Sequence, residues 1–291
     1  MIRWRGVVAP VAGCLTALLL VGCRSSVDEC ANYAPGDRLA TVSDQNVVET
    51  SGLAASLSHD DVLWAHNDKG DHARIFALGL DGVTQSTVTL RDVQAVDFED
   101  IAVGPGPDGE NYVYVADTGD NDGRRSSSSV YRFEEPELEP SVVVGVDVLE
   151  VVFPDGPVDV EAIMVDPRSG DVLLVSKGVA DMSTIYDVGT STTVQATLDL
   201  GVFPGRGQVT GADISADGST IAVRTPTHVF LWSRGVDESV IDAILGEACS
   251  LPIEAEAHGE AVAIAADGSG LYTLGEGLEQ PLWFYRYDVR L

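Results

Sequence analysis

Short apolar runs separated by turn signals fill almost the whole chain beyond its N-terminal region. The runs are rich in Val, Ile, Leu, Tyr and Phe, and Asp-Gly pairs interrupt them at 81–82, 108–109, 155–156, 217–218 and 267–268. Runs of this length between such turns are typical of antiparallel strands joined by hairpins. Helical spacing is found only over 237–247. The pattern therefore predicts an all-β protein.

One unit of this pattern recurs five times. Each copy is an apolar strand with an acidic residue at or near its start, followed by a second strand within about a dozen residues. The copies begin near residues 51, 99, 161, 212 and 260. Intervals of roughly 45–60 residues belong to the range of β-propeller blades. We therefore predict a β-propeller of five four-stranded blades, or six if the stretch 120–158 contains another unit.

Four of these blades have four predicted strands each, and the fifth has three. Blade by blade, the predicted strands are 51–56, 62–66, 74–78 and 84–90; 99–103, 112–116, 130–133 and 148–153; 161–166, 172–176, 184–188 and 194–200; 212–215, 220–224, 228–232 and 249–253; and 261–265, 270–274 and 282–287. The last blade lacks a fourth strand, which residues 38–43 near the N-terminus could supply. Such pairing closes the ring and removes a free strand edge.

The first 22 residues have the form of an export signal. Arg3 and Arg5 precede an apolar stretch that is too short and too poorly flanked to span a bilayer. The stretch ends in Leu-Val-Gly-Cys23, which resembles a bacterial lipobox; an ordinary secretory signal is the alternative. We expect cleavage before Cys23, acyl chains such as palmitate on its thiol, a tether through residue 36 and one propeller domain over 37–291.

This interpretation places the protein in the cell envelope, held to a membrane by its N-terminal lipid. In a host with two membranes, Arg24 after the lipidated cysteine, rather than Asp, resembles the outer-membrane sorting pattern, so we expect the outer membrane or the cell surface. Export also leaves Cys30 and Cys249 as an even pair in an oxidising compartment. We predict that they form a disulfide worth roughly 4–5 kcal/mol, with two free buried thiols as the alternative.

The charge of the chain limits its partners. The formal net charge is −29, and Lys69 and Lys177 are the only lysines. A field this negative repels phosphate backbones, so we expect no binding to nucleic acid. Most of the carboxylates are expected to form a solvated surface on a monomer, and the field attracts cations.

Chemistry is expected at one mouth of the propeller channel. In each blade the start of the first strand and the end of the second strand lie on the same face, around the axis. Carboxylates crowded there repel one another unless they are protonated or bridged by a cation, and oxygen ligands suit Ca²⁺. We predict a Ca²⁺ site there; the alternative is that these side chains cap backbone amides. The candidate ligands are Asn67, Glu99, Asp117, Glu161, Asp213 and Glu260.

Three other residues at this mouth are candidates for catalysis. His66 is the one histidine predicted at this face and could act as a general base, although a lone histidine there can also be structural. Lys177 and Arg224 could hold a phosphate or carboxylate beside the cation, or simply neutralise the acids. The chain has no Gly-x-Ser-x-Gly nucleophile motif.

Seven segments give the chain a resemblance to a family of exported bacterial β-propeller lipoproteins. They begin at Glu49, Leu63, Asp97, Asp117, Phe153, Thr210 and Glu260 and include Leu-Trp-Ala-His-Asn-Asp-Lys-Gly-Asp and Asp-Phe-Glu-Asp-Ile-Ala. More distantly the chain is similar to phytase-like and gluconolactonase-like propellers, which implies acidic side chains and a divalent metal at the axis. The phytase-type site uses more Lys and Arg than this chain offers, which argues against phytate hydrolysis.

Two functions follow from these features. The first is a binding module that holds a small-molecule ligand or an envelope protein at the channel mouth. The alternative is a Ca²⁺-dependent hydrolase of an ester, a lactone or a phosphoester. The sparse cations and the missing nucleophile motif favour binding, whereas the gathering of acids, Asn and His at one mouth favours chemistry.

Overall fold

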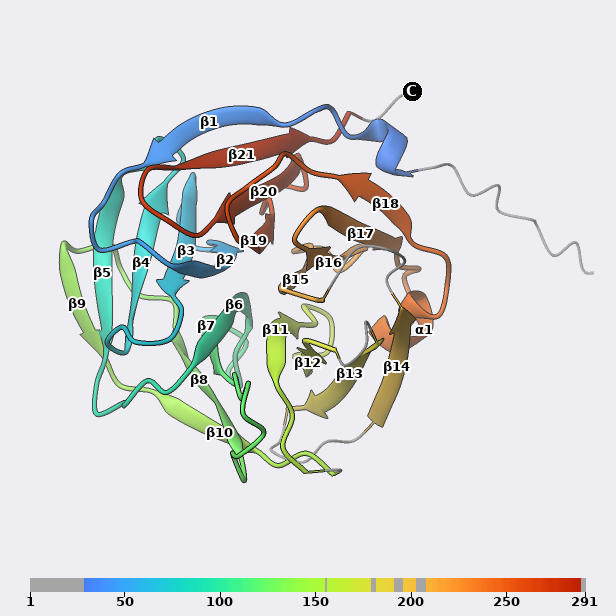
Figure 1. The fold of residues 1–291 in the computed structure, drawn as a ribbon, viewed down its shortest axis with the longest axis horizontal. Coiled ribbons are helices and arrows are strands. Elements are labelled where there is room, and N and C mark those ends of the chain that lie inside the picture. Colours follow the sequence, from blue (N-terminus) through green and yellow to red (C-terminus); the bar gives the residue numbers. More distant parts are fainter. Residues whose placement is uncertain (1–28, 155, 179–181, 191–195, 203–207, 289–291) are drawn as a thin grey trace, which may run out of the picture.

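Five β-sheets stand around a common axis like the blades of a propeller (Figure 1). The computed structural model describes residues 29–154, 156–178, 182–190, 196–202 and 208–288. In each sheet the strand nearest the axis is the apolar strand of the repeated unit. The prediction of an all-β propeller with five blades is therefore confirmed.

The blades follow one another in chain order, and the strands of each blade are named from the axis outward. Blade 1 contains β2 (Thr50–Ala55), β3 (Val62–Asn67), β4 (Arg74–Gly79), β5 (Thr84–Leu90) and β9 (Ser141–Val144). Blade 2 contains β6 (Phe98–Pro105), β7 (Asn111–Asp117), β8 (Ser128–Glu134) and β10 (Asp147–Val151). Blade 3 contains β11 (Val160–Val165), β12 (Val172–Ser176), β13 (Met182–Gly189) and β14 (Ala196–Val202). Blade 4 contains β15 (Gly211–Ile214), β16 (Thr220–Thr225), β17 (His228–Ser233) and β18 (Cys249–Pro252). Blade 5 contains β19 (Gly259–Ile264), β20 (Gly270–Gly275), β21 (Gln280–Arg286) and β1 (Asp37–Val42).

The long stretch 120–158 adds no sixth blade. It supplies the two outer strands of blade 2, and between them β9 crosses to blade 1. There β9 runs parallel to β5 and gives blade 1 a fifth strand, which the sequence pattern did not predict. A strand that pairs with a partner more than fifty residues away leaves no local signal in the sequence.

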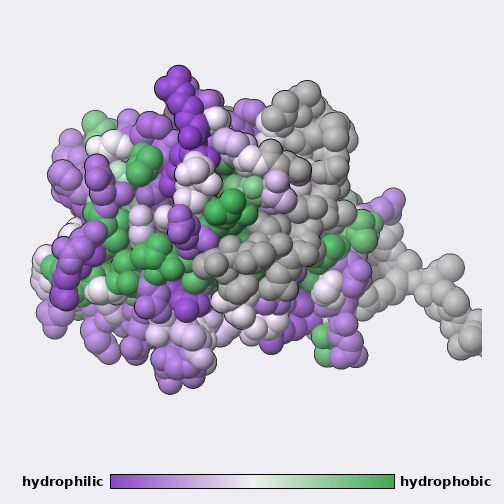
Figure 2. All heavy atoms as spheres, turned by 90° about the horizontal axis from the view of Figure 1, so that it is seen from below, coloured by the Kyte–Doolittle hydropathy of each residue, from purple (hydrophilic) through white to green (hydrophobic). Residues whose placement is uncertain are grey.

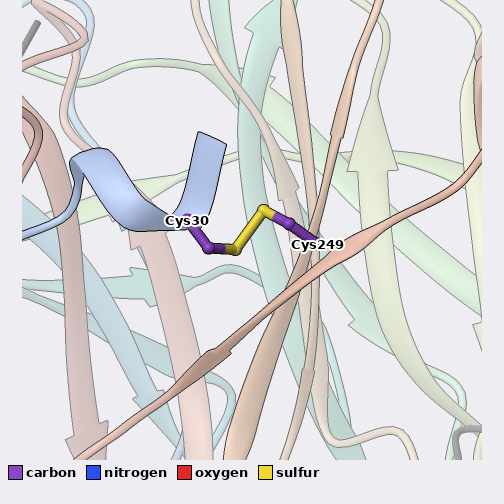
Figure 3. Close-up of a disulfide and its surroundings, with 2 residues drawn as sticks. All are labelled: Cys30 and Cys249. Atoms are coloured by element: carbon purple, nitrogen blue, oxygen red, sulfur yellow. A yellow bond between two sulfur atoms is a disulfide. The ribbon is translucent and has the colours of Figure 1, made fainter. Parts of the chain in front are cut away.

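The N-terminal arm closes the ring as predicted. β1 pairs antiparallel with β21 and becomes the outer strand of blade 5. Ahead of it, the short 3-10 helix η1 (Glu29–Asn32) carries Cys30, which is joined to Cys249 at the start of β18 by a disulfide with an S–S distance of 2.11 Å (Figure 3). The disulfide prediction is confirmed, and the bond fastens the closing arm to blade 4.

The hydrophobic core lies between the blades. Among the described residues, buried side chains form five clusters, and each cluster draws its members from two neighbouring blades. The strands near the axis are covered on both faces, which explains why β3, β11 and β20 are buried along their whole length. Burial of apolar surface from both sides holds each blade to the next and fixes the position of the strand starts around the channel.

The side of the molecule shown in Figure 2 is mainly polar where its residues are described. Seen from the side, hydrophilic residues dominate, with hydrophobic residues in small groups between them (Figure 2). The helix expected over 237–247 forms as α1 (Val240–Ile244), with Ser239 as its N-cap. No helix in the described part of the chain is long and apolar enough to cross a bilayer. The predicted signal and the lipidation site Cys23 lie outside the described residues.

Candidate functional site

A β-bulge marks the start of the inner strand in four of the five blades. The pairing of the two inner strands shifts by one residue there, and the extra residue is Ser51, Glu99, Glu161 or Glu260. A bulge takes one residue out of the ladder and redirects its side chain. Three glutamates are thereby presented at equivalent places around one mouth of the channel.

Two of these glutamates belong to a larger group of carboxylates, which we call the mouth cluster. Asp97 and Asp159 each lie two residues before a bulge glutamate, and Asp68 follows the end of β3. Carboxylate oxygens of Asp68, Asp97 and Glu99 lie within 4.8 Å of one another, and so do those of Glu99, Asp159 and Glu161. Glu99 therefore belongs to both groups of three.

Glu99 is the unusual member of the mouth cluster. Its exposed fraction is 4%, and its carboxylate has no hydrogen bond or ion pair with any residue that the structure describes. Burial, followed by the nearby charge of Glu161, raises the pKa of Glu99 to about 11. Asp68 lies next to it with one buried carboxylate oxygen that also has no partner among the described residues. Burying charged oxygens without donors is costly, so this pocket favours a proton or a cation.

The backbone of the β7–β8 loop encloses Glu99. A Cβ atom at Gly119 would collide with a carboxylate oxygen of Glu99 and lie 2.7 Å from the carboxylate carbon of Asp97. Gly119 itself is held by a hydrogen bond from its N–H to the carbonyl of Asp97. Only glycine therefore leaves room for both carboxylates beneath this loop.

The two lysines of the chain lie on either side of the mouth cluster. Lys69 Nζ is 2.7 Å from Asp97 Oδ2, and Lys177 Nζ is 2.5 Å from Glu161 Oε1 and 3.8 Å from Asp159 Oδ2. Burial raises the pKa of Glu161 to about 7 although Lys177 opposes the shift. Burial lowers the pKa of Lys177, but the carboxylates of Glu161, Asp159 and Glu99 together raise it by more, so this ammonium stays charged. The lysines balance only part of the negative charge.

Glu260 lies at the edge of the same mouth. Burial and the charges of Glu161 and Glu276 raise its pKa to about 8. It is not one of the residues whose oxygens meet within 4.8 Å, so the structure places it near the mouth cluster but outside both groups of three.

Asn67 and Asp117 have backbone partners. Asn67 ends β3, and its Oδ1 accepts hydrogen bonds from the N–H groups of Val48 and Glu49 at 3.0 and 3.1 Å. Asp117 ends β7 and accepts from the N–H groups of Val96 and Asp97 in the same way. Each side chain thus fixes the segment that leads into the inner strand of its own blade. The structure does not bring either residue into the groups of three.

Asp213 also lies apart from the mouth cluster. Blade 4 has no bulge between its inner strands, so Asp213 pairs with Ala222 well inside the strand. Its carboxylate accepts from the N–H groups of Ile214 and, in the next blade, Ile264. Burial raises its pKa to about 7. Asp213 lines the same small cavity as Leu57, Pro167, Ala216 and Ala266, which follow the far ends of the inner strands.

Asp100 joins three blades at the axis. It is fully buried, and its carboxylate accepts from the N–H groups of Ile101, Ile163 and Ala212. These residues belong to blades 2, 3 and 4. Asp100 was not among the candidate ligands, and its hydrogen bonds show that it holds the inner strands together beneath the mouth cluster.

Two of the three catalytic candidates are completely buried. His66 packs edge-on against Phe98, and burial lowers its pKa to about 4, so the ring is neutral at pH 7. Arg224 is paired with Glu256 and donates to the carbonyls of Ala261 and Leu274. Lys177, with 28% of its side chain exposed, is the candidate that faces the mouth cluster.

Asp68, Asp97 and Asp159 were not among the ligands predicted from the sequence. A sequence signal for Asp97 and Asp159 is present. The pattern Asp-x-Glu occurs at 97–99 and at 159–161, each time where an inner strand begins. Residues two apart in an extended chain point to the same side, so this pattern doubles the carboxylates on the channel side.

Comparison with known proteins supports the fold. No protein-family model matches the chain, and no curated protein matches it. Among solved structures, a gluconolactonase from Xanthomonas campestris is similar, with a TM-score of 0.52 and 12% identity over 84% of this chain and 88% of that chain. The two share the propeller fold. Hydrazine synthase from Kuenenia stuttgartiensis gives a TM-score of 0.43 at 12% identity, over 77% of this chain and 61% of that chain.

These comparisons bear on the two resemblances differently. The distant similarity to gluconolactonase-like propellers is confirmed at the level of the fold, since 12% identity carries no statement about activity. Membership of a family of exported lipoproteins stays a prediction.

Proposed function

We propose that this protein is a calcium-binding β-propeller of the cell envelope, which binds a ligand at its channel mouth. The observation that carries the proposal is Glu99, which is buried between carboxylates of blades 1, 2 and 3 and has no partner for its carboxylate among the described residues. A Ca²⁺ ion takes six to eight oxygen ligands at about 2.3–2.6 Å, so oxygens within 4.8 Å of one another suit it. Asp68, Asp97, Glu99, Asp159 and Glu161 would hold it.

The bound ligand is expected to carry a carboxylate or a phosphate. A cation at the mouth cluster supplies positive charge, and Lys177 adds an ammonium group that is partly exposed beside Glu161. Arg224 takes no part because its guanidinium is enclosed by Glu256 and backbone carbonyls. A small anionic molecule or an acidic side chain of an envelope protein fits this arrangement.

The position in the cell belongs to the same proposal. Cleavage before Cys23 and lipidation of its thiol would hold the propeller at a membrane surface, with the outer membrane or the cell surface as its place. Labelling with a palmitate analogue, compared between the wild type and Cys23→Ser, tests this directly. Loss of label in the variant supports anchoring, and an unlabelled wild type contradicts it.

Metal content is the first test of the site. The soluble domain without the lipidated cysteine should contain Ca²⁺ after purification, and its melting temperature should fall when a chelator is added. Glu99→Gln should abolish both effects, whereas Glu247→Gln, at an exposed carboxylate on the outer side of blade 4, should change neither. A metal-free wild type whose melting curve ignores both chelator and added Ca²⁺ would contradict the proposal.

A second candidate function is hydrolysis of an ester, a lactone or a phosphoester. It is favoured by the lysine that faces the mouth cluster, because a cation next to Lys177 could polarise a substrate oxygen while the ammonium group orients an anionic substituent. The base would be a carboxylate, since His66 is fully buried. Ca²⁺-dependent turnover of p-nitrophenyl esters, lactones or phosphates that is lost in Glu161→Gln would establish this function. If the domain retains its metal but turns over none of these substrates, the binding function is the one that remains.

A further inference from the structure

The mouth cluster consists of two groups of carboxylates rather than one. Asp68 and Asp97 lie on the side of Glu99 that belongs to blade 1 and the start of blade 2, and Asp159 and Glu161 lie on the side of blade 3. Each group is complete only with an oxygen of Glu99. A carboxylate has two oxygens, so one glutamate can serve two cations at the same time.

Each group also has a lysine of its own. Lys69 contacts Asp97 in the first group, and Lys177 contacts Glu161 in the second. No other lysine occurs in the chain. A protein with a net charge of −29 has therefore placed both of its ammonium groups against these two sets of oxygens.

We propose that the channel mouth binds two divalent cations, one on each side of Glu99, and that the Glu99 carboxylate bridges them. The proposal rests on the proposed function and adds the number of ions and the role of Glu99. The observation that supports a bridge is the Glu99 carboxylate, which is buried and has no partner in the described part of the chain. A single ion bound by one group would leave the other group crowded and unbalanced.

The charges of the described residues agree with two ions. Five carboxylates and two lysines leave a charge of three negative units when all are ionised (−5 + 2 = −3). One divalent ion leaves one negative unit, and a second brings the site to one positive unit. That surplus is the charge needed to hold the anionic ligand of the proposed function.

Titration of the soluble domain with Ca²⁺, after complete removal of metal, tests the number directly. Calorimetry should give two ions per molecule for the wild type and for the control Glu247→Gln. Asp68→Asn and Asp159→Asn should each keep one, while Glu99→Gln should weaken both by at least tenfold. Circular dichroism and elution volume establish that the variants are folded, and Asp97→Asn replaces Asp68→Asn if the latter is not.

The lysines provide a second readout that does not depend on removing a ligand. Because an ammonium group and a cation compete for the same oxygens, Lys69→Gln should tighten binding at the first group several-fold, and Lys177→Gln should do so at the second. Loading with Mn²⁺, which also prefers oxygen ligands, adds a test of the bridge. A pair of ions that shares a carboxylate gives an exchange-coupled paramagnetic resonance spectrum with half the hyperfine spacing of an isolated ion.

The outcomes separate the two proposals. One ion per molecule, or two ions without coupling, would overturn the bridge and leave the single-ion site of the proposed function intact. No ion at all would remove both proposals. Two ions with independent losses in Asp68→Asn and Asp159→Asn, and a coupled spectrum that disappears in Glu99→Gln, would establish the bridge.

Discussion

Arg224 forms an ion pair in the interior of the protein. Its guanidinium and the Glu256 carboxylate are both completely buried, and Thr273 donates a second hydrogen bond to that carboxylate at 2.7 Å. A buried ion pair loses the solvation of both charges. The hydrogen bonds to the pair offset part of that cost, although the buried Nε of Arg224 has no partner among the described residues. Because Arg224 lies near the end of β16 and its acceptors lie in and next to β19 and β20, the pair joins blade 4 to blade 5.

Replacing Arg224 should therefore act on stability. Arg224→Met leaves the Glu256 carboxylate buried and unpaired, and we expect a loss of about 3–5 kcal/mol in the free energy of unfolding. Arg224→Met/Glu256→Met should recover a large part of that loss because neither charge is then left alone. Urea denaturation measures both. If the single variant unfolds like the wild type, the pair is not structural.

The shifted pKa of Glu260 leads to a prediction about pH. The native carboxyl keeps its proton up to about pH 8, whereas the unfolded chain releases it near its usual pKa of 4.5. Between these values the unfolded state binds fewer protons, so the stability of the metal-free domain falls as pH rises. In chelator, the melting temperature of Glu260→Gln should fall less between pH 5 and pH 8 than that of the wild type. Parallel curves would contradict the shift.

The strands illustrate what a sequence can predict locally. All the predicted strands form within a few residues of their expected bounds, because apolar alternation and Asp-Gly turns act between neighbours in the chain. The closing strand β1 could also be predicted, since blade 5 was otherwise one strand short. The parallel strand β9 could not, because its pairing with β5 depends on where the chain leaves blade 2.

The candidate ligands show how far the metal site could be predicted from the sequence. Asp213 and Glu161 were both predicted as ligands because each lies near the start of an inner strand, but a register shift between the inner strands decides how such a side chain is presented to the channel. Blade 3 has that shift at Glu161 and blade 4 does not. Similarly, the capping of amides by Asn67 and Asp117 depends on the path of the chain ahead of each inner strand. No single residue type predicts a β-bulge. The structure was therefore needed to tell the ligand positions of blades 2 and 3 from the other candidates.

Gly119 offers a test of the loop above the mouth cluster. A methyl group there would displace the Glu99 carboxylate, so Gly119→Ala should weaken Ca²⁺ binding at least tenfold while the blades stay folded. Gly145→Ala is the matched control, because a Cβ atom at that position has no neighbour within 4 Å among the described residues. Calorimetry with Ca²⁺ compares the two variants. Equal affinities in both would show that Glu99 is not held by this loop.

At the scale of the whole molecule, the ring is closed by two different kinds of bond. β1 is hydrogen-bonded to β21, so the first and last strands of the domain share blade 5. The disulfide then attaches the residues ahead of β1 to blade 4, and its two cysteines are 219 positions apart in the chain. A ring of blades opens most easily where its two chain ends meet, and the covalent bond lies at that place.

Removal of this bond should lower the stability of the whole ring. In the chain-entropy model a loop this long stabilises the fold by about 5 kcal/mol, and for a domain of this size that corresponds to roughly 10–20 °C in melting temperature. Cys30→Ser/Cys249→Ser avoids a free thiol, and calorimetry in the presence of Ca²⁺ measures the change. The number of bound ions should stay the same. The disulfide attaches to β18 on the outside of the ring, whereas Glu99 and Glu161 belong to β6 and β11, the strands next to the axis (Figure 1). A double variant that melts within a degree of the wild type would mean that the pairing of β1 with β21 closes the ring without help.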